Sequence, residues 1–407
     1  MTRRNLIVLG GGEDQIPAYV EGRRLGYRII GVDQRPDALG AAFANEFVCL
    51  TTRDPEAIAR RLGPIDVAAV ISPASDAAQA SVATLSRHYG TAFQPSPLAV
   101  RASQDKGYFH AVVRCLGFPR YRQAQSGDPQ VLVEAAARMT YPLVVKPADS
   151  SGSKGLGCVR DPAELRTAIA TARRQSFRGD ARVEEMVVGR HYSAECFVRA
   201  GRPELTVVTA RTLTPLPAMI SVSHLVPADL HDSLGGRLRE MIAAILAALE
   251  HRAGPVNFDF VVDAAGTIHF VEMGARLGGN GMPLLVRHAF GLNTMEAAIR
   301  LAAGESLDVT GHGQQRVVLL HVLTAEREGT LRAVHGVAAT RDLPHVADLK
   351  IFKRPGDRVH PYTRAAHKLG YLIVAADTRG ELFRTVGAAR RTLRFVIDPD
   401  PSTREKA

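Results

Sequence analysis

The stretch VNFDFVVDAAGTIHFVEMGARLGGNGMP, residues 256–283, decides the fold, because it sets two acids inside two apolar runs. Both runs have the composition of strands, and the Ala-Ala-Gly between them predicts an antiparallel turn. Counting outward from that turn sets Asp259 nearly opposite Glu272. A carboxylate in an apolar strand costs free energy unless it is paired or binds a cation. We therefore expect Mg²⁺ between the two carboxylates, with two structural salt bridges to Arg or Lys as the alternative.

An earlier stretch, YPLVVKPADSSGSKGLGCVR at residues 141–160, predicts a phosphate-binding segment. A strand delivers Lys146 directly into a Gly/Ser run, whose backbone amides and hydroxyls can meet phosphate oxygens. The glycines permit the positive φ angles that aim successive amides at one point. The lysine precedes the glycines, unlike a P-loop, where Gly-Lys-Ser/Thr opens a helix. A nucleoside triphosphate fits this pattern, and a solvated hairpin loop is the alternative.

The composition is that of a soluble globular protein with two to three domains. The chain has 407 residues, of which 46% are hydrophobic and 23% charged. Its net charge of +10 and its scattered arginines, with no Trp, favour small anionic substrates over nucleic acid. No apolar run approaches the roughly 18 residues of a membrane span. The four cysteines are far apart, which predicts free thiols in a reducing cytoplasm.

Residues 1–95 alternate strand-like and helical patterns, which predicts a doubly wound parallel sheet. The expected strands are 5–10, 27–33, 46–50 and 67–72, and the expected helices are 14–25, 54–62 and 76–89. Gly10 to Gly12, with Asp33 at the end of the second strand, suggest a dinucleotide site. However, Gln15 stands where the third glycine of that fingerprint belongs. NAD binding is thus one alternative, and contact with another ligand is the other.

The remainder of the chain mixes helices with antiparallel strands. We expect helices at 103–115, 129–139 and 229–250, and one antiparallel sheet built from segments between residues 181 and 226. A small α+β domain is expected from residue 315, with a last helix at 379–395. The tail DPDPSTREKA, residues 398–407, is expected to be disordered.

Two lysines, a Gly/Ser run and an acid pair, in this order, resemble the ATP-grasp superfamily over nearly the whole chain. The resemblance implies an ATP-grasp fold of mixed α/β and α+β class. It divides the chain into a doubly wound pre-ATP-grasp domain, a lid and nucleotide-binding region, a catalytic antiparallel sheet and a small C-terminal α+β domain. The corresponding ranges are 1–100, 101–188, 189–314 and 315–407.

The resemblance also implies roles for individual residues. Lys106 and Lys146 would contact the phosphates of ATP. The flap over the triphosphate would be Ser150, Ser151, Gly152, Ser153, Lys154 and Gly155, and the adenine hinge would be Glu184, Glu185, Met186 and Val187. His191 would contact the ribose, and Asp259 and Glu272 would bind Mg²⁺, as two ions, with Mn²⁺ as an alternative metal. Gly274 stands where many members carry Asn, so a third protein ligand is not implied.

The segment EMGARLGGNGMP is similar to that of L-amino-acid ligases within the superfamily. This similarity implies that Arg276 receives a substrate carboxylate and steadies the tetrahedral intermediate. His224, in SHLVPADL, would line the amino-acid pocket, or would be a satisfied surface histidine. Ser221 and Ser223 stand near this histidine, where the group often has an acid.

The implied protein is an ATP-dependent carboxylate-amine ligase that works through an acyl phosphate. It would be a cytoplasmic homodimer in specialised metabolite biosynthesis, with small carboxylate and amine substrates and with neither nucleic acid nor membrane as partner. The alternative is a purine-pathway ATP-grasp carboxylase, or a formyl-phosphate-using transferase, that acts on a phosphoribosyl substrate.

Overall fold

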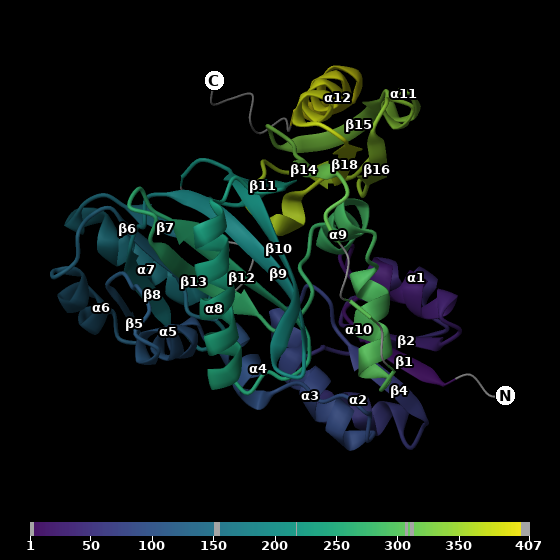
Figure 1. Cartoon of the computed structure of the whole chain (residues 1–407), viewed down its shortest axis with the longest axis horizontal. Helices are drawn as coiled ribbons and strands as arrows, with labels where there is room; N and C mark the ends of the chain where they lie inside the picture. The colour runs from purple at the N-terminus through teal and green to yellow at the C-terminus, as the bar shows by residue number, and fades with distance from the viewer. Residues whose placement is uncertain (1–3, 150–154, 217, 306–307, 310–312, 400–407) are drawn as a thin grey trace.

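The computed structural model describes residues 4–149, 155–216, 218–305, 308–309 and 313–399 (Figure 1). The chain begins with a parallel four-stranded sheet of order β3-β2-β1-β4. Its strands are β1 (Asn5–Leu9), β2 (Arg28–Asp33), β3 (Glu46–Cys49) and β4 (Val67–Ile71). This sheet confirms the predicted parallel arrangement and all four expected strands.

Helices cover both faces of this sheet. Successive strand residues point to opposite faces, and both sets are apolar, so both faces must be buried. Leu6 and Val8 pack against α1 (Ile16–Arg24) and α10 (Thr294–Ala302). Ile7 and Leu9 face α2 (Pro55–Leu62) and α3 (Gln79–His88). The short 3-10 helices η1 (Leu39–Phe43) and η2 (Asp76–Ala78) complete this part. Helix α10 lies more than 200 residues after β4 in the chain, so the N-terminal sheet packs directly against a distant part of the sequence.

One predicted helix is divided in two. Sequence analysis expected a single helix over 103–115, but α4 (Pro97–Gln104) ends before Asp105, and α5 (Lys106–Cys115) begins after it. Asp105 has an extended backbone, and its carboxylate accepts a hydrogen bond from the Tyr108 amide at 3.1 Å. An aspartate in this geometry is a helix N-cap, so it starts a new helix whose first residue is Lys106.

A second, antiparallel sheet of order β5-β8-β6-β7, called the lid sheet below, lies in the range expected for the lid. It comprises β5 (Gln123–Ser126), β6 (Leu143–Pro147), β7 (Gly157–Val159) and β8 (Ala181–Glu185), with α6 (Pro129–Ala136) and α7 (Pro162–Gln175) packed on it. Strand β8 was expected to share a sheet with the next three strands. That expectation is wrong, because β8 pairs with β5 and β6.

The largest sheet has eight strands in the order β13-β12-β9-β10-β11-β14-β18-β16. Its strands are β9 (Arg190–Arg199), β10 (Arg202–Leu213), β11 (Ser221–Val226), β12 (Gly254–Val262), β13 (Ile268–Gly274), β14 (Val317–Leu323), β16 (Val346–Ile351) and β18 (Gly370–Ala376). Helix α8 (Asp232–Ala248) lies against β10, and its apolar side belongs to a core that it shares with β9, β12 and β13.

The C-terminal strands extend this sheet, because β14 pairs directly with β11. Every residue of β18 is buried, since α9 (Met282–Phe290) covers one face and α12 (Arg379–Thr392) covers the other. A separate three-stranded sheet, β17-β15-β19, lies beside them. The remaining elements are β15 (Gly329–His335), α11 (Val337–Arg341), β17 (Arg358–Val359), η3 (Ala365–His367) and β19 (Arg394–Pro399). Most of the predicted tail, residues 400–407, lies outside the described residues.

Candidate active site

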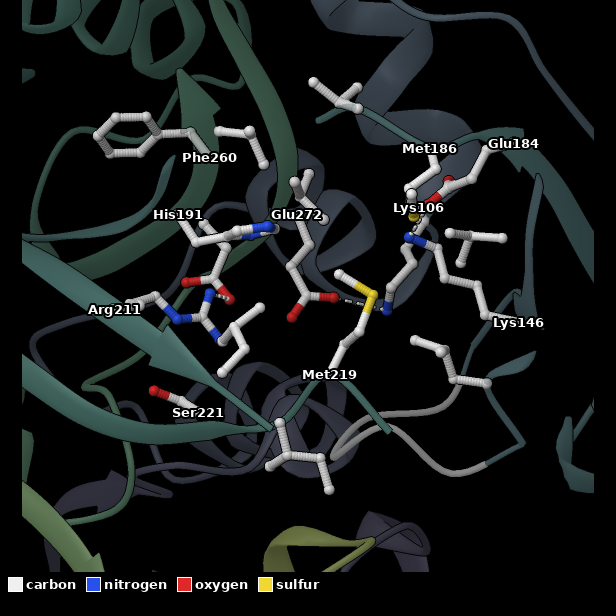
Figure 2. A pocket seen from close by; sticks show the side chains of 18 of the residues that line it. Lys106, Lys146, Glu184, Met186, His191, Arg211, Met219, Ser221, Phe260 and Glu272 are labelled. Atoms are coloured by element: carbon white, nitrogen blue, oxygen red, sulfur yellow. Dashed lines mark ion pairs between the residues drawn. The ribbon is translucent and has the colours of Figure 1, made fainter. Parts of the chain in front are cut away.

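The two acids of the opening stretch are register partners. Asp259 on β12 pairs with Glu272 on β13, as counting from the turn predicts. Both side chains line one cavity of about 250 Å³ between the large sheet and the lid sheet. Figure 2 shows that Lys106, Lys146 and Arg211 lie around the same cavity. Strands β6, β10, β12 and β13, together with the first residue of α5, thus bring these two carboxylates and three cations together at one place.

Each carboxylate has a basic partner within the protein. Lys106 Nζ lies 3.0 Å from Glu272 Oε2, and this lysine lowers the pKa of Glu272 to about 2. Asp259 pairs with Arg211 and accepts a hydrogen bond from Ser193 Oγ at 2.5 Å. The salt bridges of the alternative interpretation are therefore present. They do not close the site, because the Glu272 side chain remains 43% exposed.

The acid pair nevertheless fits a magnesium ion. Mg²⁺ is commonly held by one or two carboxylates, together with water and substrate phosphates. Within the described ranges, no group of three or more His, Cys, Asp or Glu side chains is arranged to hold a metal ion. Two carboxylates that line a cavity together with lysines suit a metal that is bound jointly with a phosphate.

The second lysine belongs to a buried ionic group. Lys146, on β6, places Nζ 2.6 Å from Glu184 Oε1, and Arg182 Nε lies 2.8 Å from Glu184 Oε2. Burial opposes ionisation of Glu184, but Lys146 and Arg182 outweigh it and lower its pKa to about 2. Burial also lowers the pKa of Lys146. The lysine and its acid line the cavity beside the Lys106–Glu272 pair (Figure 2).

The four predicted hinge residues all line the cavity. The Glu184 side chain is engaged as described above, and the Glu185 carboxylate accepts hydrogen bonds from the Arg122 and Thr140 amides at 3.1 and 2.9 Å. The Met186 amide donates to the Pro142 carbonyl at 3.2 Å. Val187 is the fourth member. These contacts fix the hinge backbone at the end of β8.

The ribose and flap predictions fare differently. His191 lines the cavity, and burial lowers the pKa of its imidazole. The predicted flap residues Ser150, Ser151, Gly152, Ser153 and Lys154 lie outside the described residues. Gly155 is described, with φ +70°, and its neighbour Leu156 is the one that lines the cavity.

Arg276 and His224 lie outside the described lining of this cavity. Two nitrogens of Arg276 bind the Asp76 carboxylate, at 3.0 and 2.7 Å, so its guanidinium already holds a carboxylate of the chain. His224 is buried, not at the surface. Its Nδ1 lies 3.0 Å from Thr209 Oγ1, its Nε2 lies 2.9 Å from Ser221 Oγ, and burial lowers its pKa to about 3. The substrate roles of both residues remain predictions.

Several lining residues were not predicted from the sequence. They include Tyr121, Arg211, Met219 and Asn280, whereas Ser221 had been noted as a neighbour of His224. Arg211 carried a usable signal, because it interrupts the alternating strand LTVVTARTL with a charge that packing would have to neutralise. The others carried none, since their places depend on how distant elements pack.

The backbone amides of the glycine-rich turn near the N-terminus are engaged by side chains of the same chain. The Gly11 amide donates to Asp33 Oδ2 at 2.9 Å, and the Gly12 amide donates to Gln15 Oε1 at 3.1 Å. Arg35 forms an ion pair with Asp33 at 3.2 Å. The acid expected to bind a dinucleotide ribose is therefore already engaged, which weighs against the NAD interpretation.

Two family models match the chain. Residues 139–283 match the ATP-grasp domain, and residues 321–398 match the L-amino acid ligase C-terminal domain 2. The first match spans β6, β7, β8 and the acid pair, and the second spans most of the C-terminal strands. In the part of the chain that the structure describes, no helix is long and apolar enough to cross a membrane.

Relatives in sequence and in structure agree with these matches. The chain is 29% identical to the uncharacterized protein y4rH of Sinorhizobium fredii, over 83% of this chain and 70% of that protein. It is 27% identical to a formate-dependent phosphoribosylglycinamide formyltransferase of a Synechococcus species, over 92% and 94% of the two chains. The fold matches an L-amino acid ligase from Bacillus licheniformis with a TM-score of 0.82 at 18% identity, over 98% and 100% of the chains.

Proposed function

We propose that this chain, which belongs to the ATP-grasp superfamily, joins an amino acid or a related carboxylate to an amine in an amide bond. ATP-grasp proteins are ATP-dependent ligases that use ATP and Mg²⁺, so the open questions are the acid and the amine. One observation carries the proposal. Residues 321–398 match a domain model of L-amino acid ligases, in addition to the ATP-grasp match at residues 139–283.

The proposed reaction has two steps. A carboxylate oxygen of the acid attacks the γ-phosphorus of ATP, and the bond to the β,γ-bridging oxygen breaks, which gives an acyl phosphate and ADP. The amine nitrogen then attacks the acyl carbon, loses a proton and expels inorganic phosphate, which leaves the amide. Neither step requires an oxidant or a reductant. Charge neutralisation is the main demand on the protein, because phosphoryl transfer depends on positioning and electrostatics.

The cavity side chains supply that neutralisation. We assign Lys106 and Lys146 to the phosphate oxygens, because both ammonium groups line the cavity beside the acid pair. Asp259 and Glu272 would hold Mg²⁺, which supplies Lewis-acid charge neutralisation on the phosphates when it is bound. The Glu184 side chain holds Lys146 in place, and the rest of the hinge, residues 185–187, would contact the adenine.

At the substrate end of the site, both proposed residues have partners within the chain. If Arg276 receives the acid carboxylate, it must first release Asp76, whose carboxylate occupies the same guanidinium nitrogens. His224 would act through Ser221, since Ser221 lines the cavity and accepts or donates at the histidine Nε2. The role in specialised metabolism, the homodimer and the cytoplasmic location also stay proposals. The location has the support of four unpaired cysteines.

A purine-pathway enzyme is the second candidate, and one observation favours it. The formyltransferase relative aligns over nearly the full length of both chains. Such an enzyme would use the same ATP site with a phosphoribosyl amine as acceptor. The two candidates thus differ in the acid and in the amine acceptor, and not in the nucleotide.

Release of ADP and phosphate tests the proposal directly. Purified protein with Mg²⁺ and ATP is assayed against all pairs of the common amino acids, and in parallel against phosphoribosyl amines with formate or bicarbonate. We expect phosphate release with particular amino-acid pairs. Mass spectrometry should then find a product whose mass equals the summed masses of the two amino acids minus that of one water. Release with a phosphoribosyl amine alone would replace this proposal by the second candidate.

A further inference from the structure

A polar group at the far side of the cavity joins three distant parts of the chain. Asp14 follows the glycine-rich turn after β1, Asn280 follows β13, and Lys368 precedes β18. The backbone amide of Asn280 donates a hydrogen bond to Asp14 Oδ1 at 2.7 Å. Lys368 Nζ donates to Asp14 Oδ2 at 2.7 Å and to Asn280 Oδ1 at 2.8 Å. The three residues therefore form a closed triangle, and Asn280 is the member that lines the cavity.

The backbone at Asn280 is held in an uncommon conformation. Its φ of +54° lies in the left-handed region, which asparagine tolerates better than most residues. The hydrogen bond from its backbone amide to Asp14 ties this turn to the loop that follows β1 in the N-terminal domain. Gly279 leaves room for that approach, since a Cβ there would lie 3.4 Å from Asp14 Oδ2 and 3.2 Å from Ala74 Cβ. The conformation of the loop after β13 thus depends on Asp14, a residue outside the eight-stranded sheet.

Lys368 determines which end of the Asn280 amide faces it. An ammonium group has donors only, so it requires the carbonyl oxygen and not the amino group. The bond is well protected, because Lys368 is only 4% exposed and lies over the Phe352 ring at 5.7 Å. The Nδ2 amino group of Asn280 is then left as a donor, with no protein acceptor within the described ranges.

We propose that Lys368 and Asp14 are positioning residues that turn the Asn280 amino group toward the cavity, where it donates a hydrogen bond to an oxygen of the carboxylate substrate. This inference rests on the proposed ligase function. The chemistry follows from the inventory of groups: Nδ2 only donates, and a carboxylate only accepts. The glycine-rich N-terminal turn, whose amides are filled by the chain itself, thereby gains a function as the support of Asp14.

The test compares the KM for the acid with the KM for ATP in matched variants. Lys368→Met keeps the length of the side chain but removes the donors, so the amide can rotate and present its oxygen. We expect the KM for the acid to rise about tenfold, as for a lost hydrogen bond to a charged group, with the KM for ATP changed less than about twofold. Lys368→Arg retains donors only and should restore the KM for the acid to within about threefold.

A control and a second variant keep the test decisive. Lys350→Met removes a lysine that is 54% exposed, on the neighbouring strand β16, and should change neither constant. Asn280→Asp keeps the size of the side chain and replaces the donor by an acceptor, so it should raise the KM for the acid more than tenfold even if Lys368→Met fails to fold.

The outcomes separate this inference from the function on which it rests. If no acid elicits ADP release from the unmodified protein, the ligase proposal fails, and this inference fails with it. If the unmodified protein is active and Asn280→Asp keeps its KM for the acid within twofold, the present inference alone is wrong. A raised KM for the acid in Asn280→Asp, with restoration by Lys368→Arg of what Lys368→Met loses, would establish it.

Discussion

Two regions of this chain look like nucleotide sites in sequence, and the structure treats them differently. At the N-terminal turn, the Gly11 amide is engaged by Asp33 at the end of β2, the Gly12 amide by Gln15, and the Asp33 carboxylate also by Arg35. At the β12–β13 hairpin, Asp259 and Glu272 also have partners, but they line a cavity shared with two lysines. The residue types in these two regions are similar, so they do not distinguish a candidate binding site from a turn whose polar groups are already paired. The two regions are distinguished by whether their polar side chains line a cavity.

Removal of the Glu272 carboxylate is expected to have the largest effect. Glu272→Ala deletes one of the two acids that would hold the metal and leaves Lys106 without its partner. We expect substrate-dependent ADP formation to fall by about 10²-fold or more, with an unchanged circular dichroism spectrum. Glu240→Ala, on the exposed side of α8, is the control. Retained turnover in Glu272→Ala would remove the hairpin from the mechanism.

Loss of Lys146 should weaken nucleotide binding. Lys146→Ala removes a donor proposed for the phosphates and leaves Glu184 with Arg182 as its remaining cation. A hydrogen bond between charged groups contributes about 1.5–3 kcal/mol, so the Kd for Mg²⁺-ATP should rise about 10- to 100-fold. Titration calorimetry measures this constant, with Lys350→Ala as control. An unchanged Kd would exclude Lys146 from the phosphate site.

A buried acid on β9 should make stability depend on pH. Burial raises the pKa of Glu195 from 4.5 to about 7, although the Gly278 amide donates to it at 3.1 Å. The folded state then binds more protons than the unfolded state between these values, so the free energy of unfolding falls as pH rises through that window. Across it the loss from this residue is about 3 kcal/mol.

Glu195→Gln should remove that loss. Urea denaturation at pH 5 and pH 8 measures the free energy of unfolding in both proteins. We expect the free energy of unfolding of Glu195→Gln to rise relative to that of the unmodified protein between pH 5 and pH 8. The free energy of unfolding of Glu240→Gln should equal that of the unmodified protein at both pH values. A difference between Glu195→Gln and the unmodified protein that is equal at both pH values would show that Glu195 does not titrate there.

The N-terminal turn should show the smallest response. Mg²⁺-ATP should raise the melting temperature of the protein, since a ligand at a hundred times its Kd adds about 2.7 kcal/mol. NAD at the same concentration should leave it unchanged, and Asp33→Asn should keep the KM for ATP. Stabilisation by NAD that Asp33→Asn abolishes would mean that both regions bind nucleotides.

Sequence reasoning reached the parts of the site that local rules determine. A short turn sets the register of a hairpin, so the pairing of Asp259 with Glu272 could be counted. The lysine at the end of β6 and the hinge after β8 followed from the order of motifs. The engagement of Arg276 by Asp76, 200 residues away, could not be counted, because it depends on how the N-terminal sheet packs on the catalytic region. The triangle of Asp14, Asn280 and Lys368 escaped notice for the same reason.

An isotope experiment tests the acyl phosphate most directly. The acid substrate found by the amino-acid screen is labelled with ¹⁸O in both carboxylate oxygens, and the inorganic phosphate released during turnover is analysed by mass spectrometry. If the carboxylate attacks the γ-phosphorus, each phosphate carries one ¹⁸O atom and the nucleotide product is ADP. Unlabelled phosphate, or AMP with pyrophosphate in place of ADP, would contradict the account.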